Sequence, residues 1–263
     1  MSEVDGMTTK DARFGTLIER NDGADFPFYN LIPAKVATWK WIVIILACAL
    51  GFLSLSLIGF ENQWLELIPR LLFVGIPLAA FILLVKPNWK AIFRPIKGRD
   101  IGAMVIFWLL TLVVSALAAF IASGGQLGGL TQNSATSTVL DGGAGGVIAF
   151  YVGTFVQLFG EELFTILPFL AVLYWLHSKA GLSRKASVVL AWVITAIWFG
   201  AAHLPTYGWN VIQAIFVIGA ARIVLTLAFI RTKNILVSFG AHLINDWVTF
   251  TFALVTAAAT TAG

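Results

Sequence analysis

The 263-residue chain is 59% hydrophobic and only 11% charged, and its mean hydropathy is +0.90. A soluble domain of this size needs more polar surface, so the composition excludes an ordinary soluble protein and predicts an all-α, polytopic transmembrane helix bundle. The net charge of +4 comes from basic residues beside apolar runs, so no nucleic-acid partner is expected. The single cysteine, Cys48, excludes a disulfide framework and a cysteine-based zinc site.

Residues 1–40 carry charges of both signs and no apolar run, which predicts a cytosolic, partly disordered tail ahead of a transmembrane domain over residues 41–263. A spanning helix needs about 20 mostly apolar residues. Runs of this kind predict seven spans, or eight if a short or re-entrant helix near the end is added. The predicted spans cover residues 41–60, 67–85, 101–122, 147–176, 186–203, 211–230 and 235–257. The fourth is long enough to tilt, or to break at Pro168.

Lysine and arginine residues gather before the first predicted span and after the second, fourth and sixth spans. Short cytoplasmic loops retain positive charge. The N-terminus is therefore expected in the cytoplasm, with the C-terminus on the opposite side of the membrane.

Polar residues also lie inside the last four predicted spans. They are Glu161, Glu162, His203, Arg222, His242, Asn245 and Asp246. A charge at mid-bilayer costs about 2.5–3.5 kcal/mol on insertion scales, so such groups normally face the bundle interior and find partners there. Adjacent helical residues point about 100° apart, so Glu161 and Glu162 each need a partner of their own. The histidine and asparagine side chains could also serve only as hydrogen-bond partners between helices.

These residue types can carry hydrolytic chemistry. A buried glutamate can act as a general base near neutral pH, and His203 is its candidate partner if the fourth and fifth spans pack together. His242 and Asp246 are four residues apart and share a helix face. That face could hold an oxyanion through His242, with Asp246 fixing its tautomer, or it could ligate a metal.

Two expectations concern charge and depth. Arg222 is expected to pair with Glu162 or Asp246, or to reach an interface with its long stem. Counted from the cytosolic ends of their spans at about 1.5 Å per residue, Glu161 lies about 22 Å deep, His203 about 25 Å and His242 about 10 Å. The three groups are therefore not expected to lie level unless a helix tilts or breaks, or the seventh span begins earlier.

Three motifs in order, Glu161-Glu162, Phe199-x-x-x-His203 and His242-x-x-x-Asp246, resemble the pattern of the CPBP intramembrane proteases. That family includes CAAX prenyl endopeptidases and bacterial relatives linked to bacteriocin processing or self-immunity. The resemblance covers residues 147–257.

The resemblance implies that Glu161 is the general base with His203, that Glu162, His242 and Asp246 complete the catalytic set, and that His242 and Asp246 stabilise an oxyanion. Phe199, Asn245 and Arg222 support them. One position departs from the pattern, because Ile166 stands where the first motif has an arginine. The hypothesis is that Arg222 supplies this charge from another helix.

The sequence thus predicts an endopeptidase that hydrolyses peptide bonds with water activated by glutamate and histidine. Its expected substrates are membrane-associated peptides or lipidated proteins, either prenylated or bacteriocin-like. Its expected location is the bacterial plasma membrane, in contact with the membrane lipids. No cofactor is expected, although zinc at Glu161, His203 and His242 is not excluded; the helical His-Glu-x-x-His signature is absent. The alternatives are a non-proteolytic immunity or scaffold protein, or a proton-coupled transporter, which uses similar buried residues.

Overall fold

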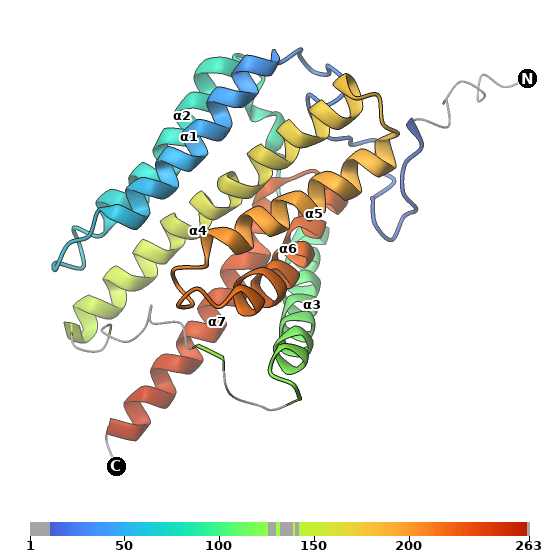
Figure 1. The fold of residues 1–263 in the computed structure, drawn as a ribbon. Helices are drawn as coiled ribbons and strands as arrows, with labels where there is room; N and C mark the ends of the chain where they lie inside the picture. The colour runs from blue at the N-terminus through green and yellow to red at the C-terminus, as the bar shows by residue number, and fades with distance from the viewer. Residues whose placement is uncertain (1–10, 126–129, 132–138, 140–141, 262–263) are drawn as a thin grey trace, which may run out of the picture.

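A computed structural model describes residues 11–125, 130–131, 139 and 142–261. Within these residues the chain is all-α and contains no strand, which confirms the predicted fold class (Figure 1). The helices are α1 (Thr38–Leu57), α2 (Leu67–Val85), α3 (Gly98–Ala122), α4 (Gly143–Tyr174), α5 (Arg184–Ala202), α6 (Gly219–Thr232) and α7 (Ile235–Thr261). Three short elements complete the set, namely η2 (Asn88–Ile92), η5 (Trp175–Lys179) and η6 (Ile212–Ile218).

The helix α4 forms the centre of the bundle. The α1–α2 pair packs on one side of it, α5 and α7 pack on other sides, and α3 covers α6 and α7 (Figure 1). In its most apolar stretch 78% of α4 is buried, compared with 17–28% for α1, α2 and α3. These three helices therefore present apolar side chains outward, as expected for contact with lipid.

Six helices of the described residues are long and apolar enough to cross a membrane. Together with the exposed apolar surface of α1, α2 and α3, this makes the chain a multi-pass membrane protein. The seventh predicted span corresponds to α7, Ile235–Thr261, which is not one of these six. An eighth long helix is not found within the part of the chain that the structure describes.

The long fourth span was expected to tilt or to break at Pro168, and the break does not occur, because α4 runs through this residue. A proline inside a helix removes the hydrogen bond to the carbonyl four residues earlier, here that of Phe164. The indole Nε1 of Trp198 on α5 donates to this carbonyl at 3.2 Å. A neighbouring helix thus satisfies the group that Pro168 leaves free.

Residues 11–37 pack against one end of the bundle, although their sequence predicts part of a tail without an apolar core. Phe26, Phe28 and Tyr29 are buried in the main hydrophobic core. The preceding residues 1–10, part of the expected disordered tail, lie outside the described residues.

A buried ion-pair cluster attaches this segment to α5 and to the turn between α6 and α7. Glu19 accepts two hydrogen bonds from Arg184, at 2.7 and 2.6 Å, and one from Lys233 at 2.9 Å. Burial alone would raise the pKa of Glu19, but these two cations lower it to about 2. The segment therefore caps the end of the bundle that carries most of the basic residues.

Candidate active site

The two adjacent glutamates of α4 lie in different surroundings. Glu162 is fully buried, whereas Glu161 is 8% exposed and lines a cavity. The roughly 100° between successive side chains on a helix accounts for this difference.

Glu162 lies at the centre of a closed network of hydrogen bonds. Arg222 from α6 donates two hydrogen bonds to its carboxylate, at 2.6 and 2.9 Å. Ser238 donates a third at 2.5 Å, and Thr226 accepts from the remaining side of the arginine at 3.1 Å. A buried charge pair is tolerated only when its partners and remaining hydrogen bonds are in place. Arg222 therefore pairs with Glu162, one of the two acidic partners expected for it. Ile166, which stands where the family motif has an arginine, is buried in the apolar core.

The imidazole of His242 lies between three carboxylates. Its Nδ1 donates to Glu162 at 2.9 Å, since an ion-paired carboxylate can only accept. Its Nε2 lies 3.8 Å from Glu161 and 3.7 Å from Asp246. Glu162 therefore accepts the hydrogen bond that fixes the tautomer of His242. This corrects the expectation that Asp246 is the acceptor. Asn245, beside them, donates to Asp246 at 3.0 Å.

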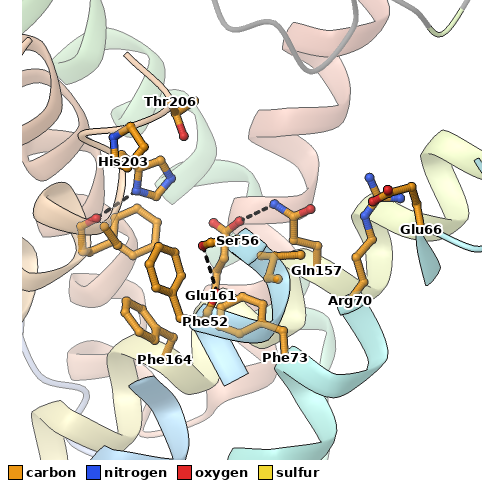
Figure 2. A pocket seen from close by; sticks show the side chains of 14 residues that line it. Phe52, Ser56, Glu66, Arg70, Phe73, Gln157, Glu161, Phe164, His203 and Thr206 are labelled. Atoms are coloured by element: carbon orange, nitrogen blue, oxygen red, sulfur yellow. Dashed lines mark hydrogen bonds between the residues drawn. The ribbon is translucent and has the colours of Figure 1, made fainter. Parts of the chain in front are cut away.

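A cavity of about 370 Å³ opens beside Glu161 (Figure 2). Its wall comes from α1, α2, α4, α5 and the segment after α5, and the lining residues include Phe52, Phe73, Phe164, Phe199, Gln157, His203 and Thr206. Gln157, one turn before Glu161, donates to its carboxylate at 3.0 Å. Glu161 and His203 thus share one cavity, as the predicted base and its partner must.

The orientation of His203 follows from its backbone contact. Its Nδ1 lies 2.8 Å from the carbonyl oxygen of Phe199, so this nitrogen donates and Nε2 remains able to accept a proton. The Phe199 ring lies 4.5 Å from the His203 ring and 6.3 Å from that of His242, measured between centroids. The Arg222 guanidinium lies 5.2 Å from the Phe199 ring centroid. Phe199 therefore separates the two histidines and contacts the arginine of the buried network.

The predicted mismatch in depth between Glu161 and His242 is wrong. Their side chains approach to 3.8 Å, although α4 does not break and α7 begins at the predicted Ile235. The prediction assumed that every cytosolic helix end lies at one level. Instead the turn from Thr232 to Asn234 is buried beneath the N-terminal segment, with each residue 2% exposed. His242 therefore reaches the level of Glu161 within two turns of its helix.

Sequence reasoning missed Gln157 and Ser238. Both lie four residues before a predicted site residue, Gln157 before Glu161 and Ser238 before His242, and both are therefore on the same helix face. This spacing was the available signal. Arg70 and Glu66, which also line the cavity, gave no signal because they belong to a part of the chain without a motif.

The zinc alternative concerns Glu161, His203 and His242. Among the described residues no group of three His, Cys, Asp or Glu side chains is arranged to hold a metal ion. The expectation that no cofactor is required stays a prediction.

The fold and this cluster define a class of protein, a polytopic helical membrane protein with paired glutamates and two histidines at a cavity inside its bundle. Residues 143–248 match the family model described as Rce1-like, type II CAAX prenyl endopeptidase. The match covers less than half of the chain, and the matched segment contains Glu161, Glu162, His203, His242 and Asp246, so this part of the chain is similar to that family. No curated protein matches the chain, and no solved structure does.

Proposed function

We propose that this chain is an endopeptidase that hydrolyses a peptide bond within the membrane, with water activated by Glu161. The observation that carries the proposal is the position of Glu161. Its carboxylate lines the cavity and accepts a hydrogen bond from Gln157. It also lies 3.8 Å from the imidazole of His242, and the buried Glu162–Arg222 ion pair fixes the orientation of that imidazole.

In this proposal the Glu161 carboxylate takes a proton from a water molecule, and the water oxygen bonds to the carbonyl carbon of the substrate. Nε2 of His203 accepts a hydrogen bond from the same water and orients it. The carbon–nitrogen bond then breaks, and Glu161 returns the proton to the leaving amine. The products are a new carboxylate and a new amine.

His242 stabilises the charge that develops on the carbonyl oxygen. Its Nδ1–H is committed to Glu162, so Nε2 faces Glu161 and Asp246. In its protonated form this nitrogen donates to the oxyanion, and stabilisation of this kind often contributes most to the acceleration of acyl transfer. An ionised carboxylate cannot donate a hydrogen bond, so Asp246 does not itself bind the oxyanion. Its negative charge, 3.7 Å from Nε2, instead favours the protonated imidazole of His242.

The cavity wall favours an apolar, membrane-associated substrate. Aromatic side chains from four helices line it beside the carboxylate of Glu161, namely Phe52, Phe73, Phe164 and Phe199. The family match supports a peptide or prenylated protein as substrate.

The cavity lies toward one end of the bundle. The lining residues come from the C-terminal ends of α1 and α5 and the start of α2, which is the end opposite the basic loops and residues 11–37. If the basic end is cytoplasmic, as the loop charges predict, the substrate enters from the outer side of a bacterial plasma membrane.

The test uses purified protein in lipid nanodiscs with two peptides, a farnesylated CAAX peptide and an unmodified apolar peptide. Products are identified by mass spectrometry, and reactions in ¹⁸O-labelled water show whether one water oxygen enters the new carboxylate. Glu161→Gln keeps the shape of the side chain but cannot accept the proton, and we expect it to abolish cleavage. A parallel reaction with chelator tests metal dependence.

Thermal unfolding of each variant is the control for folding. If folded wild-type protein gives no product from either peptide, or if Glu161→Gln cleaves as fast as wild type, the proposal is wrong. Activity that chelator removes and zinc restores would contradict only the metal-free mechanism.

A further inference from the structure

Met104 on α3 lies against the backbone of α7, close to the buried network of Glu162. A Cβ atom added to Gly240 would lie 2.5 Å from Sδ of Met104 and 2.9 Å from both its Cγ and its Cε. The thioether therefore rests directly on the glycine backbone and leaves no room for a larger group. Met104 also packs against an apolar cluster from α3, α6 and α7, whose members are Ala103, Phe107, Val224, Leu225, Ala228, Val237 and Ala241.

Gly240 lies between two residues that bind Glu162. Ser238 precedes it by two residues and His242 follows it by two, and both donate hydrogen bonds to the Glu162 carboxylate. Two residues correspond to about 200° around a helix, so Gly240 faces nearly the opposite direction from these donors. α7 is thus packed between Met104 of α3 on one side and Glu162 of α4 on the other. A larger group at Met104 therefore presses on the helix that positions His242.

Oxidation enlarges a thioether without any change of sequence. Hydrogen peroxide transfers one oxygen atom to the methionine sulfur, which loses two electrons and becomes a sulfoxide, while the second oxygen leaves as water. The sulfoxide is polar, and a polar group that is buried without a hydrogen bond is destabilising. At Met104 this oxygen would enter an apolar cluster and a contact that has no spare room.

Met104 is accessible to a small, uncharged oxidant. Its side chain is partly exposed, and it lies six residues after the start of α3 at Gly98. This corresponds to about 9 Å along the helix axis. The chain has three methionines, and Met104 is the one that the described residues include. Its oxidation can therefore be followed separately from that of Met1 and Met7.

We propose that Met104 is an oxidation site, at which an oxidant of the peroxide class displaces α7 and thereby lowers the rate of cleavage. The displacement moves His242 from its position 3.8 Å from Glu161 and strains its hydrogen bond to Glu162. Reduction of the sulfoxide by a methionine sulfoxide reductase reverses the change. The loss of cleavage rests on the proposed function, whereas the displacement of α7 does not.

The experiment treats the purified full chain in nanodiscs with hydrogen peroxide and compares each protein with its own untreated sample. Peptide mapping by mass spectrometry measures the fraction of Met104 that carries one added oxygen. For oxidised wild type we expect kcat for the farnesylated peptide to fall about tenfold to a hundredfold, as for a small misplacement of a catalytic group. The midpoint of thermal unfolding should fall by about 5 °C. Treatment with the reductase should restore both quantities.

Two variants provide matched controls. Met104→Leu keeps a side chain of similar volume but has no sulfur at this position, so peroxide should change neither its kcat nor its midpoint. The second control combines Met104→Leu with Ile106→Met, which moves the thioether to a residue of α3 that is 63% exposed. Oxidation there should also leave both quantities unchanged. Met1, Met7 and Cys48 remain in both variants, so any effect of their oxidation would appear in the controls.

Oxidised Met104 with an unchanged midpoint would overturn the proposal, as would equal losses in wild type and Met104→Leu. A Met104 that stays unoxidised in the folded protein, while Ile106→Met reacts, would overturn it as well. A lower midpoint with unchanged kcat would refute the effect on cleavage. If no protein cleaves the peptide, the midpoints still decide whether the sulfoxide displaces α7, so failure of the proposed function is distinguished from failure of this inference.

Discussion

Substitution of Arg222 by glutamine tests the buried network most directly. In the structure Arg222 and Glu162 are both fully buried and joined by two hydrogen bonds, at 2.6 and 2.9 Å. Arg222→Gln leaves the Glu162 carboxylate without its cation in a low-dielectric interior. Breaking a buried pair in this way costs about 3–5 kcal/mol, and for a chain of this size we expect the midpoint of thermal unfolding to fall by about 10 °C.

A double variant separates stability from positioning. Arg222→Met with Glu162→Met removes both charges and fills a similar volume, which is often neutral or stabilising relative to the intact pair. We therefore expect the thermal midpoint to recover most of the loss. Cleavage should not recover, because His242 has lost the acceptor for its Nδ1–H and its orientation is no longer fixed.

The assay is thermal unfolding by intrinsic fluorescence, combined with kcat for the farnesylated peptide in nanodiscs. Unchanged stability and unchanged kcat in Arg222→Gln would refute the argument that this arginine replaces the missing motif cation. Full recovery of kcat in the double variant would show that Glu162 does not act through His242.

Two more predictions concern the N-terminal segment, residues 11–37, and the packing of the helices. The pKa of Glu19, about 2 in place of 4.5, contributes about 3 kcal/mol of stability above pH 4.5. This contribution is lost as the pH falls from 4.5 toward 2, so thermal midpoints should drop in that window for wild type and much less for Glu19→Gln. Gly200→Ala places a Cβ 2.5 Å from the backbone oxygen of Ala214 and should lower stability by about 1–3 kcal/mol. An unchanged unfolding midpoint would show that α5 and η6 can separate at no cost.

Much of the fold was predictable because hydropathy marks spanning helices strongly. The start of α7 at Ile235 and both ends of α2 were predicted to the residue. The change from π-helix to α-helix within the sixth predicted span, at Gly219, was not, because the two conformations have the same apolar pattern. The packing of residues 11–37 against the bundle was not predicted, because the many charged residues of this segment suggested a tail. The aromatic residues Phe26, Phe28 and Tyr29 were a signal of burial.

The chemical groups of the candidate site were visible in the sequence, but their connections were not. Spacing on one helix places Asp246 beside His242, and the structure does bring them to 3.7 Å. The stronger contact of His242 comes from Glu162 on another helix, at 2.9 Å. Which of several buried acids meets a given histidine depends on how the helices pack, and no sequence period contains this information.

The two glutamates show how the surroundings determine what one residue type can do. Glu162 is surrounded by donors from Arg222, Ser238 and His242, so its negative charge is fully compensated and it cannot take part in proton transfer without losing those bonds. Among the residues that the structure describes, the Glu161 carboxylate has one hydrogen-bond donor, Gln157, and it lines the cavity. Only Glu161 therefore retains the freedom that a general base needs, and Glu162 is the group that keeps His242 in place beside it. Exchanging the two roles would require α4 to rotate by about 100°. This rotation would bring a larger side chain to the position of Gly160, where even a Cβ atom would lie 2.6 Å from the Phe73 ring.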